Sequence, residues 1–281
     1  MPERPDLEYV VPRLHQALVG RRITSVHPGN PVVQRLTVPG GLDVLDGAQF
    51  QDITRRSNTV CFHMDGDVDL VVAPMLAGRF QLTTPTRKRT KDTVLALDLD
   101  DSTTLWVRDK VNMGRVVTLP SRQWEKTPGL PHVGIDVLGP EFTLQALKKL
   151  AKKARNQVKL FLLDKALFDS FGNAYADETL FAAKIHPKTR VNELDDDALA
   201  RLHAAIIDTL QSAIDHIVTA QPKLENKLRD FLNVRNRKGE PCPVCGTAIR
   251  AAGVRGYDAF FCPSCQPDTK GRGFVDWRKA R

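Results

Sequence analysis

Four of the five cysteines form two closely spaced pairs near the C-terminal end of the sequence. The pairs, Cys242-x2-Cys245 and Cys262-x2-Cys265, are separated by sixteen residues. Each Cys-x-x-Cys turn can bring two sulfurs onto one ion, and four thiolates suit tetrahedral zinc. Two disulfides in a secreted domain are the alternative, but we expect no secretory signal, and Cys61 stands alone. The spacing therefore predicts one structural Zn2+ ion.

Basic residues are concentrated in two places. Lys and Arg total 41 against 33 Asp and Glu, for a net charge of +8, and residues 235–281 hold ten bases and four acids. A second run without an internal acid consists of Lys148, Lys149, Lys152, Lys153, Arg155 and Lys159. A solvated helix face is the other interpretation of such a run. The charge favours an acidic partner, with nucleic acid ahead of a membrane surface, and no apolar run approaches the roughly 18 residues that span a bilayer.

These residues need a scaffold, and residues 23–119 predict one made of strands and turns. Short apolar or alternating runs are separated by breaks rich in Gly, Pro and Asp. The expected strands are Ile23–Val26, Thr59–Phe62, Val68–Val72, Arg79–Leu82, Thr93–Leu99, Thr104–Val107 and Val116–Leu119. Their number and spacing predict a β-sandwich or barrel, with Cys61 as a core thiol. A helix over Leu7–Leu18 precedes them, and Pro12 would kink it or confine it to its first turns.

The hydrophobic period changes to 3.6 residues after Thr143, the candidate N-cap of a first helix. Further helices are expected over 156–168, 175–183, 195–220 and 223–232. Between the cysteine pairs, Thr247–Ile249 and Ala259–Phe261 predict a β-hairpin, so the zinc finger contains no helix. The fold class is α+β. The expected divisions are an N-terminal β-sandwich domain (1–125), a hinge or linker (126–142), a helical domain (143–234) and the zinc finger with its basic tail (235–281).

A turn at Gly172-Asn173 is expected between two of the central helices. Asn tolerates a positive φ, and Gly lets another backbone approach closely. The next helix would begin after Asn173, and its free amide N–H groups could hold a phosphate. From the residues alone, a helix–turn–helix with a purely structural role remains the alternative.

Three motifs occur in order along the chain. They are Pro2-Glu3 followed by Pro5 and Glu8, then Gly172-Asn173-x-Tyr175-Ala176-x-Glu178-x-Leu180-Phe181 with His186-Pro187 beyond, and then Cys262-Pro-x-Cys265-Gln266. Together they resemble the formamidopyrimidine-DNA glycosylase and endonuclease VIII family of base-excision repair enzymes. The similarity is to the family's N-terminus, to its helix–two-turn–helix signature and to its C-terminal finger. It covers nearly the whole chain.

The resemblance implies a two-layered β-sandwich, a helix–two-turn–helix domain and a β-hairpin zinc finger. Its implied partner is double-stranded damaged DNA. We expect a monomer that binds no membrane and, by elimination only, a location in the cytoplasm at the nucleoid. After removal of Met1, the secondary amine of Pro2 would attack C1′ of an extruded nucleotide and form a Schiff base, and elimination would cut the strand. An α-amino group has an ordinary pKa of about 7.7–8.0, so a useful fraction is neutral at pH 7. Glu3 would be the general acid/base at the deoxyribose.

The resemblance also implies which residues hold the DNA backbone. Lys159, Asn173 and the finger would contact phosphate. Asn58 stands where the family usually has a phosphate-contacting lysine, and it can donate a hydrogen bond but brings no charge. Tyr257 stands where the family's finger has an arginine, and Arg255 is the nearest arginine.

The family fills the gap left by the extruded base with side chains from two loops. Leu76 matches the family's Met, with Met75 adjacent, and Met113 replaces its Phe. Val111 occupies the place of the arginine that pairs with the orphaned base, so an apolar wedge of Leu76, Met75 and Met113 is expected. The implied function is a DNA glycosylase with lyase activity and an altered lesion or opposite-base preference. The alternative is a weakened or inactive relative that binds damaged or distorted DNA.

Overall fold

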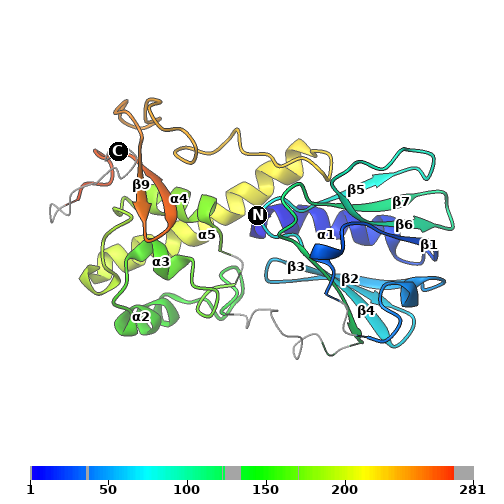
Figure 1. Cartoon of the computed structure of the whole chain (residues 1–281). Coiled ribbons are helices and arrows are strands. Elements are labelled where there is room, and N and C mark those ends of the chain that lie inside the picture. The colour runs from blue at the N-terminus through cyan, green and yellow to red at the C-terminus, as the bar shows by residue number, and fades with distance from the viewer. Residues whose placement is uncertain (1, 36–37, 122, 124–133, 170, 269–281) are drawn as a thin grey trace. The chain divides into compact units, whose positions relative to one another are not determined.

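The computed structural model describes residues 2–35, 38–121, 123, 134–169 and 171–268 (Figure 1). The chain divides into two compact units, and each of them is discontinuous in sequence. The first contains Met1–His132 and Ile214–Leu228, and the second contains Val133–Ala213 and Arg229–Arg281. This division differs from the expected one, because residues 214–228 belong with the β-sheets. Residues 126–133 of the expected hinge and the tail beyond Asp268 lie outside the described residues.

The first unit is built on two antiparallel sheets of four strands each. One has the order β2-β3-β4-β8, with bounds Phe50–Arg56, Thr59–Met64, Val68–Ala73 and Arg115–Pro120. The other has the order β1-β6-β7-β5, with bounds Ile23–Pro28, Thr93–Leu99, Thr104–Arg108 and Arg79–Thr83. Every strand expected from the sequence lies within one of these. The sheets form a sandwich in which the ring of Phe62 on β3 lies 6.0 Å from that of Phe80 on β5.

Helix α1 (Arg4–Leu18) begins earlier than expected and runs through Pro12 without ending. It starts early because Pro5 lies in the first turn, where its missing N–H costs nothing, and Glu3 is the N-cap. Proline in a helix interior usually costs one hydrogen bond. Here the helix buries an apolar stripe that includes Leu7, Leu14 and Leu18, and that burial outweighs the loss.

The second unit is helical, with α2 (Leu144–Lys153), α3 (Val158–Leu162), α4 (Asn173–Ala182) and most of α5 (Asp196–Ala220). The hydroxyl of Thr143 accepts a hydrogen bond from the N–H of Ala146 at 3.1 Å, which confirms the expected N-cap. A buried core of aromatic and aliphatic side chains joins the helices, and it includes Phe142, Phe161, Phe168, Tyr175 and Leu202.

Two helix predictions were wrong. The helix expected to reach 168 ends at Leu162, because the Asp164 carboxylate accepts the Ala166 N–H at 3.0 Å and starts a turn. The helix expected over 223–232 is absent, since these residues form only turns and irregular backbone. The Tyr9 hydroxyl donates to the carbonyl of Pro222 at 2.6 Å, and tertiary contacts of this kind override helix propensity.

The finger contains the expected hairpin, formed by β9 (Arg250–Val254) and β10 (Tyr257–Phe261). Its first strand begins after Ile249 rather than at Thr247. The connecting residues Arg255 and Gly256 both have positive φ, 43° and 90°, as a two-residue hairpin turn of type I′ requires.

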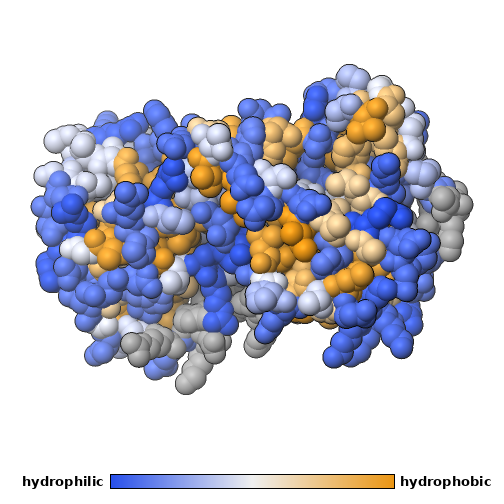
Figure 2. All heavy atoms as spheres, turned by 180° about the vertical axis from the view of Figure 1, so that it is seen from behind, coloured by the Kyte–Doolittle hydropathy of each residue, from blue (hydrophilic) through white to orange (hydrophobic). Residues whose placement is uncertain are grey.

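No described helix is long and apolar enough to cross a membrane. Hydrophilic residues cover most of the face drawn in Figure 2, and hydrophobic residues gather in smaller areas between them.

Candidate active site and zinc centre

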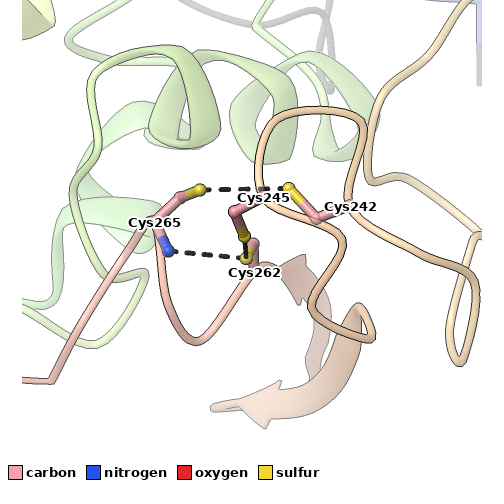
Figure 3. Close-up of side chains that lie close together, drawn as sticks. All are labelled: Cys242, Cys245, Cys262 and Cys265. Carbon is pink, nitrogen blue, oxygen red and sulfur yellow. Dashed lines mark hydrogen bonds between the residues drawn. The ribbon is translucent and has the colours of Figure 1, made fainter.

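The four paired cysteines converge on one point of the second unit, and their side chains point toward one another (Figure 3). The Sγ atoms of Cys245 and Cys262 are 3.4 Å apart, and those of Cys242 and Cys265 are 3.9 Å apart. Zn–S bonds of about 2.3 Å in a tetrahedron place sulfurs about 3.8 Å apart, so the donor set fits zinc. A disulfide needs about 2.05 Å, and all five cysteines are free thiols, which rules out the disulfide alternative here.

Two backbone turns shape this zinc site. The N–H of Val244 points at the Cys242 sulfur and the N–H of Cys265 at the Cys262 sulfur, both at 3.4 Å. Donors of this kind stabilise thiolate ligands. The protein therefore holds one structural zinc ion, which would fix the finger's loops and leave no ligand position for a reaction.

Cys61 is not part of this cluster. It lies on β3 with only 3% exposure, and burial raises the pKa of its thiol to about 12. The predicted core role is confirmed.

Glu178, a residue of the helix–two-turn–helix motif, binds the backbone of residues 233–235, which precede the zinc finger. Its carboxylate accepts hydrogen bonds from the backbone N–H groups of Asn233, Val234 and Arg235 at 2.8–2.9 Å. It also accepts one from the Asn233 side-chain amide at 3.1 Å. Four bonds to one buried carboxylate fix this segment against α4.

Lys159 is a correction to the expected DNA contacts. Its side chain is fully buried, and the ammonium group donates to the Asp177 carboxylate and to the backbone carbonyl of Asp258. Asp177 also binds Arg235, at 2.8 Å. In this structure Lys159 therefore fastens the hairpin to the helices and presents no charge to a phosphate. The sequence could not reveal this, because Asp258 lies 99 positions away.

Two further motif residues also join the finger to the helical core. The Gln266 side chain accepts from the Cys262 N–H at 3.0 Å and donates to the Ile185 carbonyl at 2.9 Å. The ring of Phe261 meets that of His186 at 5.0 Å in an edge-to-face arrangement. Much of the helix–two-turn–helix signature thus positions the finger.

The remaining expected DNA contacts of this unit are at least partly accessible. Asn173 is the first residue of α4, and its Oδ1 is buried without a hydrogen-bond partner in the described structure. Arg255 is exposed at the hairpin turn, and Tyr257 next to it is 48% exposed.

The N-terminal residues of the first unit are held firmly. Pro2 is buried, and Glu3 is only 4% exposed at the N-cap of α1. The backbone N–H of Glu3 donates to the Asp6 carboxylate at 2.8 Å. One turn later, the Glu8 carboxylate binds Arg4 at 2.6 Å and Arg55 at 3.0 Å. These bonds fix the direction in which the chain enters the helix.

A small pocket lies beside Pro2. Apolar side chains line much of it, including Leu7, Val10, Ile217 and Leu224. Its volume of about 20 Å³ holds roughly one water molecule. A second cavity of about 580 Å³ shares the segment Pro222–Leu228 and Arg79 with this pocket and adds the charged side chains of Asp92, Arg108 and Lys110.

Asn58 is a second correction. It belongs to the two-residue turn between β2 and β3, where Ser57 has a φ of 50°. The Arg55 guanidinium binds the carbonyl of Ser57 at 2.9 Å, and Asn58 is only 5% exposed. Its side chain is therefore buried in the turn and is not displayed on the surface.

The residues of the expected wedge lie on two neighbouring loops, because Ala73 at the start of one pairs with Arg115 at the end of the other. Leu76 is 57% exposed, Met113 53% and Val111 46%. Met75, which is less exposed, has a φ of 42°.

The second wedge loop is built around Asp109. Its carboxylate accepts from the N–H groups of Val111 and Gly114 at 3.1 and 2.6 Å. The loop is thus fixed while its apolar tips face outward.

A β-sandwich with a buried Pro-Glu N-terminus, and a helical unit carrying a four-cysteine finger, define a DNA glycosylase of the zinc-finger type. Three family models agree with this. They are the formamidopyrimidine-DNA glycosylase N-terminal domain at residues 1–116, its H2TH domain at 133–222, and the zinc finger found in FPG and IleRS at 239–267. The chain belongs to the formamidopyrimidine-DNA glycosylase family.

Full-length relatives support the same assignment. The chain is 34% identical to the formamidopyrimidine-DNA glycosylase of Desulforamulus reducens, over 95% of this chain and 99% of the relative. It is 35% identical to that of Symbiobacterium thermophilum, over 96% and 91%.

Solved structures agree with these relatives. Lactococcus lactis Fpg bound to DNA with an abasic site superimposes with a TM-score of 0.84 at 28% identity, over 95% of this chain and all of that one. The MutM (Fpg) protein of Thermus thermophilus gives 0.81 at 27% identity, over 94% and 98%. The protein is a DNA-binding base-excision glycosylase of a family in which lyase activity and attack by an N-terminal proline are general.

Proposed function

We propose that Pro2, freed of Met1, is the nucleophile of this protein and that Glu3 moves protons at the reacting sugar. The support is the position of both residues at the fixed start of α1, with Pro2 lining a pocket. The amine lone pair attacks C1′, the bond from C1′ to the base breaks, and the bonding electrons leave with the base as it gains a proton. The nitrogen then loses its own proton, and the C1′–O4′ bond opens as O4′ takes the bonding electrons and a proton, which leaves an iminium between the nitrogen and C1′. The iminium acidifies the proton on C2′, and loss of that proton expels the 3′ phosphate. Glu3 is the group that gives and takes these protons.

The substrate is damaged double-stranded DNA, on which the protein acts as a monomer at the nucleoid of the cytoplasm. The relatives crystallised with lesion-containing DNA support the choice of substrate. Asn173 at the start of α4 and the exposed hairpin turn at Arg255 and Tyr257 are the proposed phosphate contacts of the second unit.

We infer little preference for the base opposite the lesion. The wedge side chains Leu76 and Met113 are apolar and exposed, so they can fill a gap in the duplex. Val111, at the position of the missing arginine, is also apolar and exposed and offers no hydrogen bond to an orphaned base.

A second candidate is a family member with weakened catalysis that mainly binds damaged DNA. Two observations favour it. Asn58 is buried and uncharged, and Tyr257 gives the finger no positive charge at that position. Asn58 replaces a lysine of the family and Tyr257 replaces an arginine, so each position lacks a cation that would bind phosphate.

Borohydride trapping separates the two candidates. The protein is incubated with duplex DNA containing one abasic site, borohydride is added, and covalent adducts are resolved on a denaturing gel. Nucleophilic catalysis by Pro2 gives an adduct that is lost in Pro2→Gly and in a form with an N-terminal tag. Lys91→Gln, a surface change on the first unit, keeps the adduct. Tight binding of the same DNA without any adduct would refute the enzymatic proposal in favour of the binding one.

A further inference from the structure

The connection between β5 and β6 lies across one face of a sheet. Both strands pair antiparallel with β7, so they run parallel to each other, and the chain between them must cross over the sheet. The crossing segment, residues 84–92, contains Arg87, Lys88, Arg89 and Lys91. It is anchored at its end by Asp92, whose carboxylate binds Arg108 at 2.9 Å.

This basic segment lies on the outer face of the sheet. Leu95, Leu97 and Leu105 point into the core from the same strands. The residues that alternate with them, Ala96 and Trp106 among them, point outward and are nevertheless at most 1% exposed. The crossing segment covers them, with the Arg87 guanidinium 5.6 Å from the centre of the Trp106 ring.

A cavity of about 520 Å³ is left between the segment and the sheet. Arg87, Lys88 and Arg89 line it from the segment, and His27, Asp98 and Thr104 line it from the strands. None of these residues borders the pocket beside Pro2. The volume lies within the range of small-molecule sites, about 300–1,000 Å³.

The one carboxylate in the cavity is already satisfied. Asp98 accepts a hydrogen bond from the Thr104 hydroxyl and faces the His27 ring nitrogen, both at 2.6 Å. Burial tends to raise the pKa of Asp98, but these bonds and the charge of Arg89 outweigh it and leave the pKa below its ordinary value. The site therefore combines three cationic side chains with one carboxylate, Asp98, which already binds Thr104 and His27. The net charge of the lining is positive, which favours an anionic ligand.

We propose that this cavity binds a phosphate group through Arg87, Lys88 and Arg89. Guanidinium and ammonium groups are the side chains best suited to phosphate oxygens, and residues carrying three of them line one cavity of suitable size. A free nucleotide and the backbone of a nucleic-acid strand present the same phosphate chemistry. The site is separate from the proposed reaction centre and stands independently of the role given to Pro2.

Calorimetric titration of the zinc-loaded protein tests the site. The ligands are inorganic phosphate, dAMP and a single strand of ten thymidines, titrated into the parent protein, Lys88→Gln, Lys88→Arg and Lys91→Gln. Lys91 is the matched control, because it is exposed on the same segment but does not line the cavity. We expect Lys88→Gln to weaken binding about tenfold, as the loss of one charge-assisted hydrogen bond implies. Lys88→Arg and Lys91→Gln should each change it by less than about threefold.

The three ligands assign the source of the phosphate. If inorganic phosphate or dAMP binds and Lys88→Gln weakens that binding, the site takes free phosphates. If only the oligonucleotide responds to Lys88→Gln, the site takes a strand. The proposal is overturned if Lys88→Gln and Lys91→Gln give the same affinities for all three ligands, with unfolding temperatures equal to that of the parent.

Discussion

Replacing Glu178 by Gln should show how much the docking of the zinc finger depends on one carboxylate. One oxygen of Glu178 accepts from the N–H groups of Val234 and Arg235, and the other accepts from the backbone and side chain of Asn233. Glutamine turns an NH2 group toward one of these pairs, so two donors that are buried or partly buried lose their acceptor. Each unsatisfied buried donor costs about 1–3 kcal/mol, which gives a loss of about 4 kcal/mol.

The assay is thermal unfolding of the zinc-loaded protein followed by circular dichroism. At roughly 2–4 °C per kcal/mol for a unit of this size, Glu178→Gln should lower the transition by about 10 °C. Glu240→Gln is the matched control, because that carboxylate also has a close partner, Arg237 at 2.7 Å, but is half exposed. An exposed pair contributes about 0–1 kcal/mol, so the control should shift the transition by less than about 4 °C. Equal shifts in the two variants would refute the docking role of Glu178.

Three further predictions concern other parts of the chain. Val111→Arg places a hydrogen-bonding cation on the wedge loop. The glycosylase rate of this variant should then depend on which of the four bases lies opposite the lesion. Identical rates opposite all four bases would contradict the apolar-wedge argument. Iodoacetamide should label no cysteine of the zinc-loaded native protein and four after chelation, with Cys61 protected by burial and by its raised pKa of about 12; rapid labelling of Cys61, mapped by mass spectrometry, would be the contrary result. Because the pKa of Asp98 is below its ordinary value of about 3.9, its contribution to stability is present above that pH and is lost as the pH falls through the lowered pKa. Thr104→Val removes one of the bonds responsible and should make unfolding less dependent on pH below about 4, as followed by denaturant titration at several pH values.

Local patterns predicted much of the fold. The alternating runs predicted every strand of the sandwich except β2, the cysteine spacing predicted the zinc site, and Thr143 predicted the cap of α2. Each of these depends on residues that lie close together in sequence, where side-chain period and turn chemistry act directly.

The wrong predictions concern residues whose burial or secondary structure depends on partners that are distant in sequence. The family resemblance implied that Lys159 contacts phosphate, but its side chain is buried against Asp177 and the backbone of Asp258. The segment after Pro222 has a helical composition, yet it is used as the wall of a pocket on the first unit. Asn58 was expected at a phosphate-contacting position, but its side chain is buried, and that burial depends on packing that no local pattern records.

Because the first unit is discontinuous in sequence, its two segments are synthesised at different times. Its sheets are complete once residue 120 has been synthesised, but the wall formed by Pro222–Leu228 follows about 100 residues later. At about 5–20 residues per second, the ribosome needs roughly 5–20 s to supply it. During that interval the nascent N-terminus lacks one side of its pocket. The proposed role of Pro2 requires the removal of Met1, and during this interval the enzyme that removes it would meet an open chain end.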